Sequence, residues 1–130
     1  MRFMSIVTSS HPPAQPPAGM MEAMNKLADR EIKAGRMIDM GGLLPLADGV
    51  QVRIKDGELS VIDGPFVEAK EVIGGFAIFE FRNKEEALAS AVEFMQLHKQ
   101  HMPGWEGTCE VRAMAGPEMG CQEVGALASA

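Results

Sequence analysis

The sequence predicts an α+β sandwich, in which an antiparallel sheet carries two helices on one of its faces. Three observations support this fold class. Apolar residues recur at helical spacing in two segments, short strand-like runs stand before and after each of these segments, and an Asp-Gly dipeptide lies between two alternating runs in the middle of the chain. The predicted order of elements is strand, helix, strand, hairpin, strand, helix and strand.

The first half of the chain predicts a strand, a helix and a short second strand. Residues 2–8 (RFMSIVT) alternate well enough for a buried strand, and four prolines in the loop over residues 11–19 forbid regular structure there. A helix is expected from Met20 to Ala34, with Gly35 as its stop. A strand over residues 37–40 and a loop or bulge over residues 41–45 follow. The expected inward stripe of the helix is Met21, Met24, Ala28 and Ile32, flanked by Met20 and Leu27.

The middle of the chain predicts a β-hairpin. Asp56 and Gly57 stand between two alternating apolar runs, and Asp-Gly is a strong signal for a two-residue hairpin loop. With this loop, Val52 faces Val61 and Val50 faces Asp63. Asp63 therefore shares the apolar face of the predicted hairpin.

The second half repeats the order of the first. Residues 76–81 (FAIFEF) are apolar on both faces and predict a strand that is covered on both sides. A helix is expected after an N-cap at Asn83 and ends before Pro103, and residues 109–114 predict the last strand. Residues 115–130 form a tail of small residues that shows no hydrophobic periodicity. The expected inward side of this helix is Ala87, Leu88, Ala91, Val92, Met95 and His98.

Together these elements make one domain over residues 1–114 of the ferredoxin-like kind, β-α-β, hairpin, β-α-β. Both helices are expected on one face of the sheet, so the other face needs a cover. Because residues 76–81 are apolar on both sides, we expect a second copy of the chain to pack sheet to sheet on the open face as a two-fold dimer.

Composition excludes several classes of function. The chain has 130 residues, with 12 Lys and Arg against 18 Asp and Glu, and its net charge of −6 disfavours binding to nucleic acid or to an anionic membrane surface. No stretch approaches the roughly 20 apolar residues of a membrane helix. Two isolated cysteines, Cys109 and Cys121, make neither a disulfide framework nor a zinc site, so a cytoplasmic protein is expected, and no metal or other cofactor is expected.

The segment from Asp63 to Phe76 contains the ionisable side chains that suggest a chemical function. Asp63 is expected where the apolar alternation points inward, and a desolvated carboxylate has a raised pKa unless a cation or N–H groups hold its charge. Arg53 and Lys70 are the candidate cations. Proton transfer at a carbon next to a carbonyl needs a positioned carboxylate and a polarising donor, which these residues could supply. The alternative is a structural Asp63 that fixes a turn before Gly64-Pro65.

Asp63-Gly-Pro-Phe, followed by Glu68-x-Lys70-Glu71 and Gly74-Gly75-Phe76, resembles the signature of the YCII-related superfamily, in particular its DGPF-domain branch. The resemblance covers most of the chain outside the Pro-rich loop and the tail. It implies a dimeric α+β barrel with a pocket between sheet and helices or near the dimer seam, and it implies enzymatic activity like that of small isomerases and lyases. Some YCII members are proposed to use a His-Asp pair. The helix over residues 20–34 has no histidine, so such a pair does not carry over.

Two functions follow from the residues and the resemblance. The first is a small-molecule enzyme or binder with Asp63 as the catalytic acid or base. Its substrate-binding residues are then expected to be Arg53, Pro65, Phe66, Glu68, Lys70 and His101, the last reaching a pocket across the dimer. The second is a non-enzymatic regulatory interaction module, because many relatives are encoded beside extracytoplasmic-function sigma factors. Eleven methionines also stand out, and those expected near the seam and the pocket mouth are Met40, Met102, Met114 and Met119.

Overall fold

The computed structural model describes residues 1–10, 15–45, 48–63 and 72–116. Two helices and six strands lie within these residues. The order along the chain is β1 (Arg2–Ser9), α1 (Ala18–Lys33), β2 (Met37–Gly42), β3 (Val50–Lys55), β4 (Glu58–Asp63), β5 (Val72–Glu80), α2 (Lys84–His101) and β6 (Thr108–Ala113).

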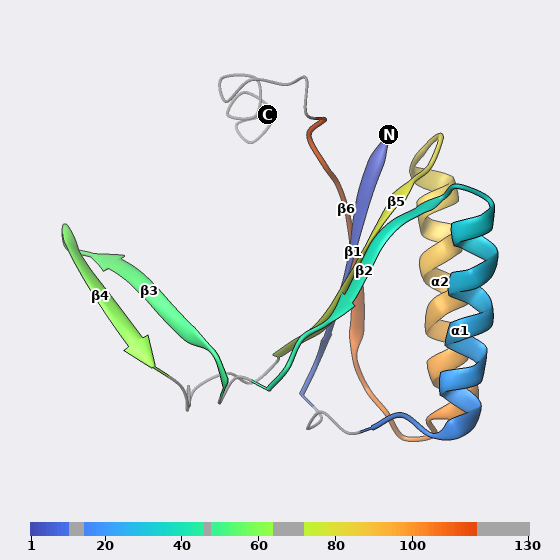
Figure 1. The fold of residues 1–130 in the computed structure, drawn as a ribbon, viewed down its shortest axis with the longest axis horizontal. Coiled ribbons are helices and arrows are strands. Elements are labelled where there is room, and N and C mark those ends of the chain that lie inside the picture. The colour runs from blue at the N-terminus through green and yellow to red at the C-terminus, as the bar shows by residue number, and fades with distance from the viewer. Residues whose placement is uncertain (11–14, 46–47, 64–71, 117–130) are drawn as a thin grey trace.

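Four of the strands form one antiparallel sheet in the order β2-β5-β1-β6. Both helices cover the same face of this sheet, as Figure 1 shows. The α+β class and the β-α-β, hairpin, β-α-β order are therefore confirmed, and the arrangement is consistent with a ferredoxin-like fold. The structure contains one chain, so the two-fold dimer stays a prediction.

The core lies between the sheet and the helices. Phe3 of β1 is in register with Phe79 of β5, so both side chains share the helix-facing side, where Phe81 and Ala87 complete the cluster. Phe79 and Phe81 stack with their ring centroids 5.0 Å apart. The opposite side of the sheet carries no helix, and its apolar side chains are only half-buried. These are Met4, Ile6, Phe76 and Ile78, which we call the open sheet face.

The expected inward stripe of α1 is partly wrong. Met21 and Ile32 are exposed, Ile32 by 56%, whereas Met20 is fully buried and Glu31 is 4% exposed. The predicted stripe left Glu31 on the polar side of the helix. Its carboxylate can be buried because it accepts a hydrogen bond from Nε of Arg36, which follows the helix, and is ion-paired with Nη2 of the same side chain. Leu88 and Val92 of α2, also expected inward, are exposed as well.

The predicted N-cap of α2 is confirmed, since Asn83 Oδ1 accepts a hydrogen bond from the backbone N–H of Glu86 at 2.9 Å. The second strand is longer than expected. It continues through Gly41 and Gly42 instead of ending in a loop, and a bulge lies between Met37 and Asp39. An added Cβ at Gly75 would stand 3.0 Å from the carbonyl oxygen of Gly41, so glycine allows β5 to approach β2 closely here.

The hairpin has the predicted register. Val52 pairs with Val61 and Val50 pairs with Asp63, and both loop residues have positive φ, 53° at Asp56 and 78° at Gly57. The pair β3–β4 is a separate two-stranded sheet that stands away from the main one (Figure 1). Neither described helix has the length and apolar character needed to cross a bilayer.

Candidate functional site

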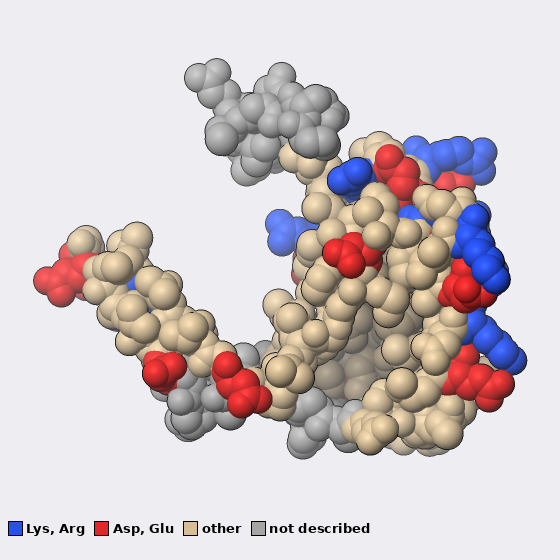
Figure 2. All heavy atoms as spheres, viewed as in Figure 1, with Lys and Arg blue, Asp and Glu red and all other residues tan. Residues whose placement is uncertain are grey.

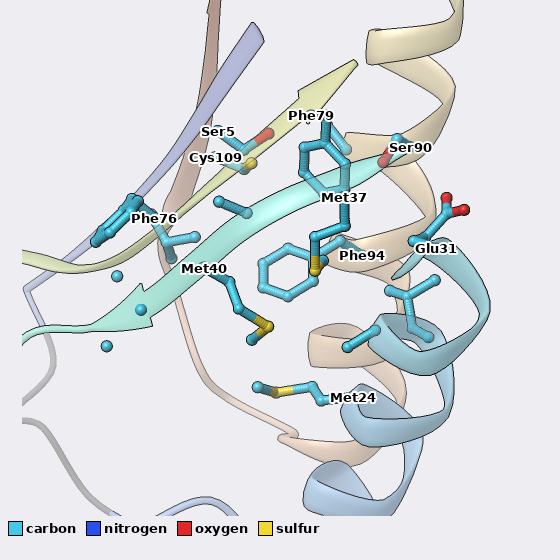
Figure 3. Close-up of a pocket in the computed structure, with 18 residues that line it drawn as sticks. Ser5, Met24, Glu31, Met37, Met40, Phe76, Phe79, Ser90, Phe94 and Cys109 are labelled. Atoms are coloured by element: carbon cyan, nitrogen blue, oxygen red, sulfur yellow. The ribbon is translucent and has the colours of Figure 1, made fainter. Parts of the chain in front are cut away.

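A pocket of about 160 Å³ lies between the sheet and the helices. Figure 2 shows the uncharged hollow between these layers, with charged side chains gathered along the outer side of the helices. In Figure 3, Met24 of α1 and Met37 and Met40 of β2 surround the space, with Phe94 of α2 behind them. We call this site the methionine pocket. Its wall is largely apolar and comes from both helices and all four strands of the main sheet.

Small residues leave the space open. Gly42 and Gly75 are paired across β2 and β5 and both line the pocket, so no side chain fills that part of the sheet. On the helices, Ala28 and Ala91 provide short side chains at the wall. The surrounding methionines are unbranched and polarizable, so they can adapt to the shape of a bound molecule.

A thiol and a hydroxyl lie on the sheet side of the pocket. Cys109 of β6 is half-buried and is hydrogen-bonded to the side chain of Ser5 of β1. Burial raises the pKa of the Cys109 thiol, and the contact with Ser5 offsets only part of this effect. The thiol therefore stays protonated at neutral pH and is a polar contact for a ligand rather than a nucleophile.

A buried carboxylate stands at the α1 side of the pocket. Glu31 Oε2 lies 2.7 Å from Arg36 Nε and 2.5 Å from Arg36 Nη2, and Glu31 Oε1 lies 3.7 Å from Arg30 Nη2. Arg30 also pairs with Glu93 of α2, whose pKa is lowered mainly by that hydrogen bond. Glu31 was not among the site residues predicted from the sequence. The signal was its position four residues after Leu27 and eleven after Met20, on the stripe that the structure turns inward.

The predicted catalytic residue does not line this pocket. Asp63 is the exposed last residue of β4, on the apolar face of the hairpin. Arg53 is also exposed, pairs across the hairpin with Ser60 on the opposite face, and has Nη2 3.4 Å from Gln51 Oε1. The described structure thus does not bring Asp63 and Arg53 together within one copy. The other motif residues, Pro65, Phe66, Glu68 and Lys70, lie outside the described residues, and so does Met119.

The histidines near the end of α2 have different surroundings. His98 is buried, its Nδ1 lies 3.1 Å from the carbonyl oxygen of Phe94, and its ring packs between Phe94 and Trp105 with centroid distances of 4.6 and 4.5 Å. Burial lowers the pKa of His98, so this ring holds a proton less readily than a solvated histidine does. His101 is half-buried, and an added Cβ at Gly19 would stand 3.3 Å from its Nδ1.

His98 and Trp105 border a second, more open hollow together with Met102. His101 lines neither this hollow nor the methionine pocket, so its predicted contact with a substrate across a dimer stays a prediction. Across the described ranges, no three His, Cys, Asp or Glu side chains gather in a way that could hold a metal ion.

Comparison with known proteins identifies a family whose sequence model matches this chain. The model of the YCII-related domain matches residues 1–94, which run from β1 into α2. An uncharacterised protein of Rhizobium meliloti (strain 1021) is 28% identical over 96 residues, a stretch that covers 74% of this chain and 73% of that protein.

Proposed function

Since the chain belongs to the YCII-related domain family, we propose that it is a small-molecule-binding protein of that family and that its ligand occupies the methionine pocket. The observation that carries the proposal is the pocket itself. It is a concave, largely apolar space with a few polar groups, which is the usual composition of a small-molecule site.

The size and lining of the pocket suggest the ligand class. A volume of about 160 Å³ resembles an apolar protein cavity of about 150 Å³ that holds benzene. Glu31 is the one charged side chain among the described residues of the wall, and its carboxylate is already paired with Arg36. The ligand is therefore a neutral, apolar molecule or group with about six carbon atoms, and Ser5 and Cys109 can contact a hydroxyl or carbonyl on it.

The proposed reaction on this ligand is proton transfer at a carbon next to a carbonyl, as in isomerases and lyases, with Asp63 as the acid or base. The segment from Asp63 leads into β5, and Gly75 of that strand lines the pocket. Because Asp63 itself does not line the wall in one copy, binding and turnover should be separable. Asp63→Asn should retain ligand binding and lose turnover once a substrate is identified.

Thermal unfolding with toluene, phenol or indole tests the binding step. A ligand at about 100 times its Kd adds about 2.7 kcal/mol to the free energy of unfolding, which raises Tm by several degrees. Ala28→Leu places three more carbon atoms at the pocket wall and should remove this shift. The matched control is Ala89→Leu, an exposed position on α2, which should keep it.

Alkylation of Cys109 provides a second measurement, because its thiol lines the same pocket. Iodoacetamide labelling at mildly alkaline pH, followed by peptide mass spectrometry, should be slower when the aromatic probe is bound. If no probe raises Tm or protects Cys109, or if Ala28→Leu and Ala89→Leu respond alike, the pocket is not the binding site.

A further inference from the structure

The second hollow, of about 300 Å³, lies at the C-terminal end of α2. Its wall comes from the last turns of this helix and from the turn that follows it. The thioethers of Met95 and Met102 and the imidazole of His98 belong to this wall, and we therefore call the site the Met-His hollow. None of its described lining residues belongs to the methionine pocket, so the two spaces are separate sites.

The imidazole of His98 has one nitrogen engaged and the other available. Nδ1 lies 3.1 Å from the carbonyl oxygen of Phe94, one helical turn earlier. Because a carbonyl oxygen only accepts, Nδ1 carries the hydrogen, and Nε2 of the neutral ring then has a free lone pair. Nε2 has no hydrogen-bond partner among the described residues, and no unpaired side-chain nitrogen there is fully enclosed, so Nε2 opens onto the hollow that His98 lines. Histidines that bind metals donate their other ring N–H in this way.

The two methionines stand on either side of His98 along the helix. Met95 precedes His98 by three residues and Met102 follows it by four, so all three share one helix face. Met102 is the C-cap residue, and its backbone N–H donates to the carbonyl oxygen of His98 at 2.8 Å, which keeps helical spacing up to this point. Residues at this spacing have Cβ atoms about 5–6 Å apart, and methionine has three rotatable side-chain bonds. Both sulfur atoms can therefore reach an ion held at Nε2.

Trp105 is folded back onto the imidazole by the turn after α2. Its backbone N–H donates to the carbonyl oxygen of Met102 at 3.0 Å, and Gly104 in this turn has a φ of 85°, which favours glycine. The ring centroids of Trp105 and His98 lie 4.5 Å apart, with an interplanar angle of 36°. An ion about 2 Å beyond Nε2 is therefore near the distance of about 6 Å at which an indole attracts a cation.

We propose that the Met-His hollow binds a soft monovalent cation, Cu(I), through Nε2 of His98 and the sulfur atoms of Met95 and Met102. Thioethers are soft, uncharged ligands that select Cu(I), whereas Mg²⁺ and Ca²⁺ prefer oxygen. Lys99 and Glu106 also line the hollow, and their opposite charges leave the described wall without a net charge that would attract a divalent ion. The described His, Cys, Asp and Glu side chains do not make a metal site by themselves, so the methionines distinguish this ligand set from that of zinc.

Tryptophan fluorescence reports binding at this place, because Trp105 is the single tryptophan of the chain and there is no tyrosine. The full chain with Cys109→Ser and Cys121→Ser, which removes the thiols that would also bind soft ions, is titrated with Ag(I) in chloride-free buffer. Cu(I) is then added without oxygen, in competition with a coloured Cu(I) chelator. One equivalent of either ion should change the fluorescence, and Zn²⁺ should not. No change with Ag(I) and Cu(I), or an equal change with Zn²⁺, overturns the proposal.

Methionine variants of the same chain test the sulfur ligands. Met95→Leu/Met102→Leu keeps the apolar volume but removes both thioethers, and it should weaken Cu(I) binding about 100-fold or more. The matched control is Met21→Leu/Met114→Leu, which removes two methionines that line neither the Met-His hollow nor the methionine pocket. This control should leave the affinity within about threefold. Equal losses in the two double variants, or no loss in the first, would show that these sulfur atoms are not the ligands.

Histidine substitutions and NMR test the nitrogen ligand. His98→Gln should weaken binding about tenfold or more, whereas His101→Gln, at a position that does not line the hollow, should retain it. Circular dichroism identifies a variant that does not fold. Imidazole ¹⁵N spectra of the chain with its histidines intact give the same information without a substitution, because Ag(I) should shift the Nε2 resonance of His98 much more than its Nδ1 resonance. A shift confined to His101, or none at either histidine, would contradict the assignment.

Discussion

Replacing Arg36 by methionine should destabilise the protein clearly more than breaking a similar ion pair on the surface. Arg36 donates from Nε to Glu31 Oε2 at 2.7 Å, and its Nη2 lies 2.5 Å from the same oxygen. The side chain of Glu31 is 6% exposed, whereas that of Arg36 is 43% exposed. Methionine retains most of the aliphatic stem and the backbone carbonyl of residue 36, which accepts a hydrogen bond from the N–H of Glu80. The substitution therefore removes the charged donor from a buried carboxylate with little other change.

The expected loss is about 2 kcal/mol of unfolding free energy. Hydrogen bonds to charged groups contribute about 1.5–3 kcal/mol, and removing one partner of a fully buried pair costs about 3–5 kcal/mol. Since Arg36 is partly exposed, water can replace some of what it gives to Glu31, and Arg30 remains 3.7 Å away on the other side. These effects reduce the cost toward the lower end of both ranges.

Urea unfolding at neutral pH, followed by far-UV circular dichroism, measures this loss from the midpoint and slope of the transition. The matched control is Lys33→Met. Lys33 pairs with Asp29 at 2.8 Å on the same helix, with side chains 75% and 63% exposed, so the loss should stay below about 0.5 kcal/mol. Losses below that value for both variants would mean that the Glu31 carboxylate is hydrated and that the buried ion pair does not hold α1 in its orientation.

Three other outcomes are expected. Burial lowers the folded-state pKa of His98, so its contribution to the free energy of unfolding should be fully present above about pH 6.5 and be lost as the pH decreases through the folded-state pKa. In a plot of urea midpoint against pH, His98→Gln should remove this decrease, whereas His101→Gln should keep it. Gly107→Ala should cost about 1–3 kcal/mol in chemical denaturation, because its Cβ would stand 2.3 Å from the Trp105 ring and 2.7 Å from the Thr8 carbonyl oxygen. Gly74→Ala, with nothing within 4 Å, should change stability by less than about 0.5 kcal/mol, and equal losses would contradict the packing argument. Cys109 should react with iodoacetamide at least about tenfold more slowly in the folded chain than in urea, and equal rates would show that the thiol is freely accessible.

The elements of the fold were predictable because local signals agreed with one another. The Asp56-Gly57 loop fixed the hairpin register, Asn83 capped α2, and Gly35, with φ of 76°, follows the end of α1. The orientation of α1 was not predictable from hydrophobic periodicity, because a buried Glu31 with an arginine partner is indistinguishable in sequence from a solvated acid on a polar helix face.

The methionine pocket was harder to foresee than the elements that form it. Its space depends on the pairing of Gly42 with Gly75 across β2 and β5, which required the strand order and the length of β2. The sequence instead directed attention to Asp63, a motif residue that the described structure leaves exposed at the end of the hairpin. A catalytic role for Asp63 requires that a ligand, or a second copy of the chain, lie next to its carboxylate.

The central position of β1 determines when the sheet can form during synthesis. β1 is the first strand to leave the ribosome, yet its neighbours are β5 and β6, so that Phe3 pairs with Phe79 on one side and Ala113 on the other. At about 5–20 residues per second, roughly 5–20 s separate the translation of Phe3 from that of Ala113. During this interval β1 is unpaired along both of its edges. We therefore expect nascent chains, rather than the finished fold, to be the form of this protein that most needs protection from aggregation.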